Sequence, residues 1–369
     1  MKRETLQLVE KRFKVAIAGN PNVGKSTLFN KLTGGRAWVG NWPGVTVEKK
    51  VGRFKVGEYC LEVTDLPGIY SLTAYGIDEL IARNFIVEEN PDVVINIVNA
   101  ANLERNLYLT VSLIEMGANV VVSLNMVDLA HNEGYEVDSE KLSKMLGVPV
   151  VPTVAVEGRG VEELKKEVVK AAELKRKPKI LINYGDEVEG EIDELSKIIE
   201  RDPELVRKYV PRWIAIKLLE GDPDVENRVK LSPLSNEILG RATKARERLE
   251  RSLEKDLEEY MVEKRHEFIS RVVKECVLVL ARKPVTLTDI VDYAVTHKVF
   301  GIPIMLTSLY VAFKFAFDVA APLCDLIDYF FGCFLYDLVA SSALPELVRS
   351  LLADGIITGI GSILVFVPN

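Results

Sequence analysis

A glycine-rich segment near the start of the chain has the residues needed to hold phosphate groups. It reads Gly-Asn-Pro-Asn-Val-Gly-Lys-Ser-Thr over residues 19–27, which fits the pattern G-x-x-x-x-G-K-[ST]. Its glycines let backbone N–H groups close around phosphates, and the N-terminus of the helix predicted to follow favours the same anion. We expect Lys25 to reach the β- and γ-phosphates and the Ser26 hydroxyl to bind Mg²⁺. The expected phosphate-binding residues are Gly19, Asn22, Val23, Gly24, Lys25, Ser26 and Thr27.

Two later segments are placed to complete the metal and γ-phosphate site. Asp65-Leu-Pro-Gly68 ends a predicted strand, where the Asp can hold Mg²⁺ through water and the Gly68 N–H can meet the γ-phosphate. Thr46 is placed to join Mg²⁺ when the γ-phosphate is present. The expected Mg²⁺ ligands are Ser26, Thr46 and Asp65, and the expected catalytic residues are Asn22, Lys25, Thr46 and Gly68.

A third pair of segments is expected to recognise the base. Asn125-Met-Val-Asp128 follows an apolar strand, and the Asp128 carboxylate can accept two hydrogen bonds from guanine that adenine cannot supply. Met126 occupies the position where a Lys usually stacks under the base. After a later strand, Ala155 can present a backbone N–H to the base. These residues predict GTP or GDP as the ligand.

The four segments, in this order, resemble a small GTPase of the translation-factor class. The position after D-x-x-G commonly holds a Gln that orients water, and it is Ile69 here. An aliphatic side chain cannot orient water, so intrinsic hydrolysis should be slow or depend on another group. In related GTPases with a hydrophobic residue there, an Asn of the phosphate loop coordinates K⁺, and the matching residue is Asn22. Two interpretations of Asn22 stay open, a K⁺ ligand and a loop residue that satisfies the local backbone.

The elements that must position these residues alternate between strands and helices, as in an α/β domain. Short apolar, β-branched runs alternate with helical patterns, which predicts a Ras-like, doubly wound and mainly parallel sheet over residues 1–178. The predicted strands are Phe13–Ala18, Lys49–Val56, Tyr59–Thr64, Val93–Val98, Asn119–Leu124 and Val148–Val151.

The rest of the chain is expected to be helical. Residues 179–265 are charged and helix-compatible, which predicts a small all-α domain containing one long helix near Ser235–Glu263. Residues 266–296 are expected to be an amphipathic linker next to the membrane, and residues 297–369 a partial α-helical membrane region.

Two apolar runs support the membrane assignment. Val299–Leu323 is long enough to cross a bilayer, which needs about 20 residues, although a buried helix of a soluble protein is an alternative. Gly355–Pro368 is too short to span and is cut off by the end of the chain, which we interpret as a truncated second span of a longer protein. Arg282, Lys283 and Lys298 precede the first run, so the N-terminal domains are expected in the cytoplasm.

The composition excludes several broad classes. With 48% hydrophobic residues and 4 cysteines in 369 residues, the chain is neither disordered, collagen-like nor a disulfide scaffold. The net charge of −7 gives no indication of a nucleic-acid partner. The N-terminus has no apolar core, so no signal peptide is expected.

Five segments together resemble the FeoB family of prokaryotic ferrous iron transporters. They are G-N-W-P-G-V-T-V-E (40–48), D-L-P-G-I-Y-S-L (65–72), N-M-V-D (125–128), R-W-I-A-I-K-L-L-E-G-D (212–222) and G-I-G-S-I-L-V-F-V-P (359–368). The resemblance implies a cytoplasmic GTPase, a helical domain that modulates nucleotide release, and a multi-pass region in the cell membrane that carries Fe²⁺. From the motifs above we expect GTP or GDP, Mg²⁺ and K⁺ as cofactors. The implied partners are membrane lipid, further transmembrane spans or other copies, and a small cytoplasmic accessory protein.

Candidate iron ligands cluster at the end of the first span. Fe²⁺ accepts thiolate or carboxylate ligands, but buried apolar cysteines and surface aspartates explain the same residues more simply. The cluster comprises Cys324, Cys333, Asp318, Asp325 and Asp328, whereas Cys60 and Cys276 are expected to be structural.

Two other functions stay open at this stage. One is a membrane-tethered regulatory GTPase that transports nothing. The other is a soluble GTPase associated with ribosomes or tRNA, which the absence of a basic RNA-binding appendage in the sequence disfavours.

Overall fold

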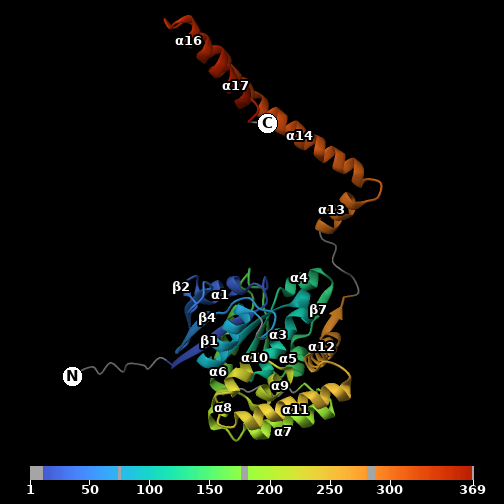
Figure 1. Cartoon of the computed structure of the whole chain (residues 1–369). Helices are drawn as coiled ribbons and strands as arrows, with labels where there is room; N and C mark the ends of the chain where they lie inside the picture. The colour runs from blue at the N-terminus through green and yellow to red at the C-terminus, as the bar shows by residue number, and fades with distance from the viewer. Residues whose placement is uncertain (1–10, 74–75, 176–181, 281–286, 368–369) are drawn as a thin grey trace, which may run out of the picture. The chain divides into compact units, whose positions relative to one another are not determined.

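The computed structural model describes residues 11–73, 76–175, 182–280 and 287–367 (Figure 1). Within it the chain forms two compact units, residues 1–284 and residues 285–369. The first unit contains the expected α/β and helical domains, and the second contains the apolar runs.

The α/β domain is built on a seven-stranded sheet whose spatial order is β2-β3-β4-β1-β5-β6-β8. The β2–β3 and β3–β4 pairs are antiparallel and the others are parallel, which confirms the predicted mainly parallel, doubly wound fold. The strands are β1 (Lys11–Gly19), β2 (Ala37–Asn41), β3 (Glu48–Val56), β4 (Tyr59–Asp65), β5 (Val93–Asn99), β6 (Val120–Asn125) and β8 (Val150–Pro152).

Alternate residues of the central strands face two separate hydrophobic clusters. In β1, Val15 and Ile17 face a cluster completed by α1 and α6, while Ala16 and Ala18 face a cluster that includes α3 and α5. Helices therefore cover both faces of the sheet. The helical elements of this domain are α1 (Lys25–Thr33), α2 (Ile77–Asn84), η1 (Phe85–Glu89), η2 (Ala100–Asn102), α3 (Leu103–Glu115), α4 (Val127–Asn132), α5 (Ser139–Leu146) and α6 (Val161–Leu174).

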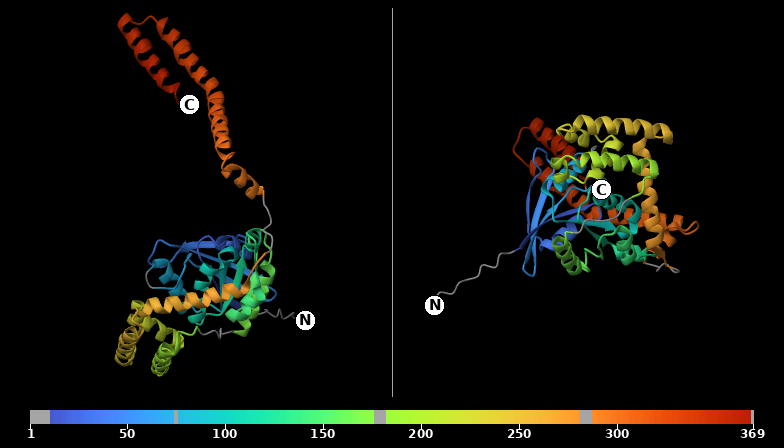
Figure 2. Two further views of the ribbon diagram at one scale, coloured as in Figure 1. Left: turned by 90° about the vertical axis from the view of Figure 1, so that its right-hand side faces the viewer. Right: turned by 90° about the horizontal axis from the view of Figure 1, so that it is seen from below.

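The second domain of the first unit is all-α, as predicted. Its helices α7 to α11 gather at one end of the α/β domain, whereas α12 packs alongside that domain against α3 and α5 (Figures 1 and 2). Buried residues of both domains, such as Leu107 and Trp213, belong to one hydrophobic cluster, so the two domains share a core. The helices are α7 (Asp186–Ile199), α8 (Pro203–Lys208), α9 (Pro211–Glu220), α10 (Pro223–Val229), α11 (Ser235–Leu253) and α12 (Leu257–Cys276).

The prediction of one long helix over residues 235–263 is wrong. Glu254 has a left-handed backbone with φ of 51°, which ends α11. The Asp256 carboxylate then accepts a hydrogen bond from the Glu259 N–H at 3.1 Å and starts α12 as its N-cap. The expected domain boundary after residue 265 falls inside α12.

A second, two-stranded sheet was not predicted from the sequence. It pairs β7 (Tyr135–Val137) of the α/β domain with β9 (Val277–Val279), which directly follows α12. Three-residue strands leave no periodic pattern in the sequence, so neither strand could be recognised.

The second unit is entirely helical within its described residues. It has two stretches long and apolar enough to cross a membrane, Gly301–Ala340 with 40 residues and Glu346–Leu364 with 19 residues. The expectation that the second run is too short to span is therefore wrong, because the helix continues through the polar residues Arg349 and Asp354. The elements are α13 (Leu287–Thr296), α14 (Gly301–Asp328), η3 (Tyr329–Leu335), α15 (Tyr336–Ala340), α16 (Glu346–Ser350), η4 (Leu351–Ile357) and α17 (Thr358–Leu364).

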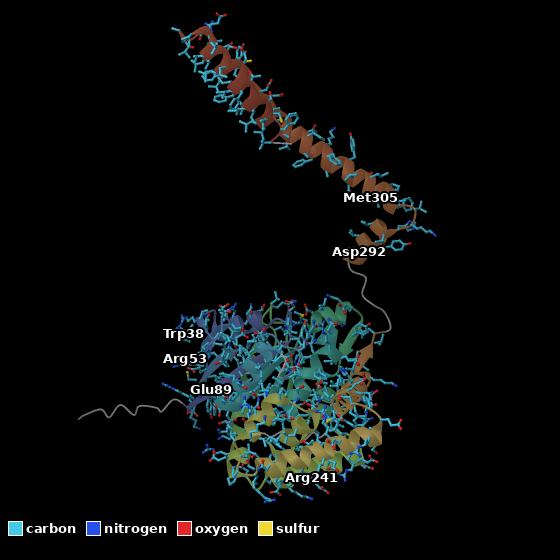
Figure 3. The ribbon with its side chains drawn as sticks, viewed as in Figure 1. Trp38, Arg53, Glu89, Arg241, Asp292 and Met305 are labelled. Carbon is cyan, nitrogen blue, oxygen red and sulfur yellow. The ribbon has the colours of Figure 1, made fainter. Side chains whose placement is uncertain are left out.

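Many large apolar side chains of this unit are exposed. Met305 of α14, labelled in Figure 3, is 57% exposed, and along both stretches the large apolar residues are similarly exposed. Such a surface fits a lipid or protein environment and not water.

Candidate nucleotide-binding site

The phosphate loop joins the end of β1 to the start of α1, the strand–loop–helix setting that the motif requires. Gly24 begins α1 with a left-handed φ of 93°. A Cβ added there would lie 2.5 Å from the Asn125 Nδ2, so only glycine fits at this position. Asn22 also has a left-handed backbone, with φ of 64°, and its side chain is exposed.

The Asp65-Leu-Pro-Gly68 segment lies directly against the phosphate loop. The Ile69 N–H donates to the Gly19 carbonyl at 3.3 Å, and a Cβ added to Gly68 would lie 3.2 Å from the Lys25 Nζ. Lys25 and Gly68, both predicted to act on the γ-phosphate, are therefore neighbours.

Lys25 and Asp65 influence each other's charge. Burial lowers the pKa of Lys25, and the nearby Asp65 opposes this change. Burial raises the pKa of Asp65, and Lys25 opposes that change in turn. Both groups are thus partly desolvated. In such surroundings the charge of a bound phosphate or cation interacts with them more strongly than it would in water.

The residues present fit a magnesium ion. The Asp65 Oδ1 is buried and has no hydrogen-bond partner in the described part of the chain, as expected for an oxygen reserved for a cation or its water. Ser26, in the first turn of α1, is exposed toward solvent. Thr46 lies in the loop between β2 and β3 and is also exposed.

Asn125 ties the predicted base-recognition segments to the phosphate loop. Its Nδ2 donates to the Val23 carbonyl at 2.9 Å, and its Oδ1 accepts from the Ala155 N–H at 2.9 Å. The Thr153 hydroxyl donates to the same Oδ1 at 3.3 Å. The amide is only 2% exposed, so this network is rigid. It joins three of the four segments singled out from the sequence.

Asp128 lies on α4, the six-residue helix that begins just after Met126. Its side chain is half-buried, and the Met126 side chain extends over Gly24, since its Cε would lie 3.9 Å from a Cβ added there. Met126, which the sequence places where a Lys usually stacks under the base, thus lies beside the phosphate loop; its contact with a base remains a prediction.

The residue directly after Gly68, Ile69, has no polar side-chain atom that could orient water. Ile69 is 2% exposed and belongs to the hydrophobic core. A hollow of about 460 Å³ lies beside Gly68 and is lined in part by Val47 and Tyr70. The Tyr70 ring is held by the Arg105 guanidinium, 4.4 Å from its centroid.

Arg83, which the sequence analysis missed, links α2 to the helical domain. Its guanidinium is 1% exposed and contacts the Asp222 carboxylate at 2.7 and 3.1 Å and the Asp224 carboxylate at 2.6 Å. It also donates to the Leu72 carbonyl at 3.5 Å, in the segment that follows Gly68. The partners are more than a hundred positions apart, so no local signal in the sequence identifies them.

A second buried ion cluster crosses the same domain boundary. Arg265 of α12 contacts Glu115 of α3 at 2.8 Å and Glu220 of α9 at 2.5 Å. Burial alone would raise the pKa of Glu220, but Arg265 and Lys217 outweigh it and lower that pKa to about 2. The charged form of Glu220 is therefore held firmly at neutral pH.

The candidate iron ligands do not form a site in this structure. Among the described residues, no three His, Cys, Asp or Glu side chains are grouped so as to hold a metal ion. The Cys324 thiol donates to the Val365 carbonyl at 3.2 Å, and Cys333 is exposed. Of the two cysteines expected to be structural, Cys276 is buried against Met145.

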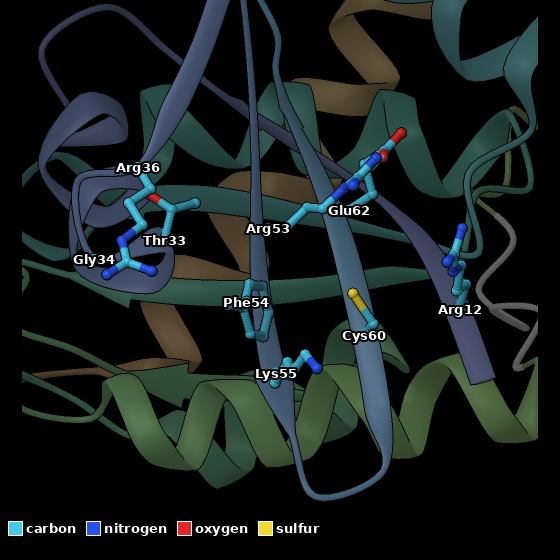
Figure 4. A pocket seen from close by; sticks show the side chains of 9 residues that line it. All are labelled: Arg12, Thr33, Gly34, Arg36, Arg53, Phe54, Lys55, Cys60 and Glu62. Carbon is cyan, nitrogen blue, oxygen red and sulfur yellow. Dashed lines mark hydrogen bonds and ion pairs between the residues drawn. The ribbon is translucent and has the colours of Figure 1, made fainter. Parts of the chain in front are cut away.

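Another hollow, of about 620 Å³, lies at the far end of α1 from the phosphate loop (Figure 4). Its lining includes Arg12, Arg36 and Arg53, the last of which is paired with Glu62 at 2.7 Å. No residue of the predicted nucleotide site lines it, so we do not assign the nucleotide to it.

Two family models match the first unit. The model described as Ferrous iron transport protein B matches residues 13–168, and the model of the FeoB cytosolic helical domain matches residues 184–278.

Among curated proteins, the Fe(2+) transporter FeoB of Methanocaldococcus jannaschii is 46% identical over 358 residues, covering 97% of this chain and 52% of that protein. The Fe(2+) transporter FeoB of Escherichia coli is 34% identical over 379 residues, covering 97% of this chain and 46% of that protein. The chain thus spans about half the length of the curated relatives that it matches.

Solved structures match over 72% of this chain. The apo cytosolic domain of T. maritima FeoB is 38% identical with a TM-score of 0.62, and the whole of it is covered. The same domain in its GMPPNP form is 40% identical with a TM-score of 0.61 and is 99% covered. A GDP-bound mutant of the S. thermophilus FeoB G domain is 37% identical with a TM-score of 0.66 and is fully covered.

Proposed function

Because the chain belongs to the FeoB family of ferrous iron transport proteins, we propose that it is the GTP-binding and GTP-hydrolysing cytoplasmic portion of an Fe²⁺ uptake transporter, together with the start of its membrane region. The curated relatives are named Fe(2+) transporters, which favours this function over the regulatory and ribosome-associated alternatives.

The hydrogen-bond network of Asn125 is the observation that carries the nucleotide assignment. One buried amide connects the phosphate loop at Val23, the N-M-V-D segment and the loop at Ala155. These are the segments that must meet around one nucleotide, with phosphates at one end and the base at the other. Structures of relatives in GDP and GMPPNP forms support the same ligand.

Each residue then has a role in the chemistry. Lys25 and the Gly68 N–H would stabilise the charge that develops on the γ-phosphate, and the closeness of Gly68 to the Lys25 Nζ supports this role. Ser26, Thr46 and Asp65 would hold Mg²⁺, which supplies positive charge to the β- and γ-phosphates. Thr46 lies in an exposed loop, and we propose that it joins Mg²⁺ only when the γ-phosphate is present, so that its position reports on the nucleotide state.

Hydrolysis is proposed to be slow without an additional cation. Ile69 is buried and offers no polar atom, so the transition state lacks one customary source of stabilisation. We propose that Asn22, which is exposed and has a left-handed backbone within the phosphate loop, coordinates K⁺ there. The K⁺ ion would supply positive charge near the transferred phosphoryl group.

The helical domain is proposed to modulate nucleotide release through the buried Arg83 contacts. The Leu72 carbonyl and the carboxylates of Asp222 and Asp224 meet at one guanidinium. A movement of the segment after Gly68 that displaces Arg83 would break these contacts, so the helical domain favours one arrangement of that segment.

The second unit is proposed to enter the cell membrane as part of a multi-pass region, with the first unit in the cytoplasm. Its two apolar stretches support this placement. Membrane lipid, further spans or other copies, and a small cytoplasmic accessory protein are the proposed partners, and Fe²⁺ is the proposed transported ion.

The experiment that tests this function uses the full gene product in proteoliposomes. We expect Fe²⁺ flux with GTP and a loss of flux and GTP binding in Lys25→Ala, because the phosphates lose their phosphate-loop cation. GTP hydrolysis without Fe²⁺ flux would instead favour a regulatory GTPase. Unchanged GTP affinity and turnover in Lys25→Ala would refute the site.

A further inference from the structure

The chain that leaves the helical domain toward the second unit is fastened to the α/β domain by strand pairing. β9 runs antiparallel to β7, with Val277 opposite Val137, Leu278 opposite Glu136 and Val279 opposite Tyr135. This pairing lies within the first unit, and β9 appears beside β7 at the end of α12 in Figure 1.

Backbone hydrogen bonds extend the pairing at both ends. The Asp138 N–H donates to the Cys276 carbonyl at 2.9 Å, and the Leu280 N–H donates to the Gly134 carbonyl at 2.9 Å. Residues 276–280 therefore lie along residues 134–138 over their whole length.

Side chains hold the same segment in place. Cys276 is fully buried with its sulfur 3.6 Å from that of Met145, and Lys141 contacts Glu275 at 3.4 Å. Val137 and Val277 are both partly buried against the hydrophobic core. The segment is thus a docked part of the domain.

The strand that pairs with β9, β7, follows the helix that carries Asp128, the residue proposed to recognise the base. Asp128 lies on α4, and the Glu133 and Gly134 N–H groups donate to α4 carbonyls at 2.9 and 3.0 Å, so α4 continues directly into β7. A helix of six residues is too short to be stable alone. In the described part of the chain, β9 is the one strand that pairs with β7.

We propose that residues 276–280 are a positioning segment for Asp128, so that the guanine site and the chain leading to the second unit are coupled through the β7–β9 pair. This inference rests on the proposed function, because it assumes that Asp128 recognises guanine. Coupling of this kind is reciprocal. A pull on β9 from its C-terminal side lowers guanine-nucleotide affinity, and bound nucleotide strengthens the β7–β9 pair.

A matched pair of proline variants tests the segment in the full chain, purified in detergent. In an antiparallel pair, hydrogen-bonded and non-hydrogen-bonded residue pairs alternate. The outer pairs Asp138–Cys276 and Gly134–Leu280 are hydrogen-bonded. The Glu136–Leu278 pair is therefore hydrogen-bonded and the Tyr135–Val279 pair is not. Leu278→Pro therefore removes a ladder hydrogen bond, whereas Val279→Pro restricts the backbone next to it without removing one.

The readout is the affinity for GDP compared with that for inosine diphosphate, which lacks the exocyclic amino group of guanine. We expect Leu278→Pro to weaken GDP binding about tenfold. Inosine diphosphate binding should fall less, because it makes fewer hydrogen bonds to Asp128. Val279→Pro should stay within about twofold of the unsubstituted chain for both nucleotides. An equal loss for both nucleotides in Leu278→Pro, or no loss, would overturn the positioning role.

A cross-strand disulfide provides a second test that does not depend on a proline variant folding. Tyr135 and Val279 are 40% and 77% exposed, and facing residues of a non-hydrogen-bonded pair are close enough for a disulfide. In Tyr135→Cys/Val279→Cys, oxidation should slow GDP release and reduction should restore it, while each single variant shows no redox effect. Identical release rates in both redox states would contradict the coupling. Failure of the unsubstituted chain to bind GDP at all would instead refute the proposed function.

Discussion

Removing the Arg83 guanidinium should destabilise the boundary between the α/β and helical domains strongly. The side chain is 1% exposed and that of Asp222 is 7% exposed, so Arg83→Ala leaves a buried carboxylate without its cation. Breaking a buried pair by removing one partner costs about 3–5 kcal/mol. The Asp222 carboxylate also caps α10 by accepting from the Asp224 and Val225 N–H groups, both at 3.1 Å, so it cannot turn away to solvent without further loss.

The control is an arginine with similar geometry on the surface. Arg53 contacts one oxygen of Glu62 through two nitrogens, at 3.0 and 2.7 Å, but the two side chains are 68% and 43% exposed. Arg53→Ala should cost only about 0–1 kcal/mol, because water replaces the contact. The two variants thus compare a buried guanidinium that contacts two carboxylates with an exposed one that contacts a single carboxylate.

Urea unfolding of a fragment ending at residue 280 measures both free energies of unfolding. Relatives of this part were solved as isolated cytosolic domains, so the fragment is a reasonable unit. The Asp222→Asn substitution keeps an N-cap and completes a double-mutant cycle with Arg83→Ala. Equal free-energy losses for Arg83→Ala and Arg53→Ala would refute the argument that burial makes the Arg83 contacts decisive.

Three further predictions concern the cation sites and the second unit. GTP hydrolysis should be faster in KCl than in NaCl of equal ionic strength, and Asn22→Ala should remove the difference; equal rates in the two salts for the unsubstituted chain would rule out the K⁺ role. Burial raises the pKa of Asp65, so its carboxylate takes up a proton at a higher pH than an ordinary aspartate does. As the pH falls, the Mg²⁺-dependent part of the nucleotide affinity should therefore be lost at that higher pH. A pH titration of affinity checks this, and Asp65→Asn should abolish the Mg²⁺ dependence; a midpoint at or below the ordinary aspartate range would contradict it. The full chain should sediment with membranes and resist carbonate extraction, whereas a fragment ending at residue 280 should be soluble; full chain that is monodisperse without detergent would contradict the membrane assignment.

The nucleotide site was largely predictable because its residues form short, contiguous motifs. An apolar strand before Gly19 and a helix after it are sufficient to place Lys25, and the structure confirms that setting. Asn125 was expected near the nucleotide, yet its bonds to the Val23 carbonyl and the Ala155 N–H emerge only from the folded chain. The role of Thr46, which is exposed in the loop between β2 and β3, remains a prediction.

The missed features depend on contacts between distant segments. β2 is short and mostly exposed, and it exists because it pairs with β3. β9 likewise forms a strand because it pairs with β7. The role of Arg83 can be recognised only from its contact with Asp222 in the folded chain. The break at Glu254 was missed because residues on both sides favour a helix, so only the left-handed backbone reveals it. The second apolar stretch was underestimated because Arg349 and Asp354 interrupt its hydrophobic pattern without ending the helix.

The base specificity of the site tests the central assignment most directly. The measurement is the affinity of the full chain and of Asp128→Asn for GTP, ATP and xanthosine triphosphate. The unsubstituted chain should bind GTP and discriminate against ATP by about a hundredfold or more, since adenine leaves the carboxylate unpaired. Asp128→Asn should weaken GTP and improve xanthosine triphosphate, because the amide donates where the carboxylate only accepts. Equal affinity for GTP and ATP, or unchanged preferences in Asp128→Asn, would contradict a guanine site at the phosphate loop and Asp128.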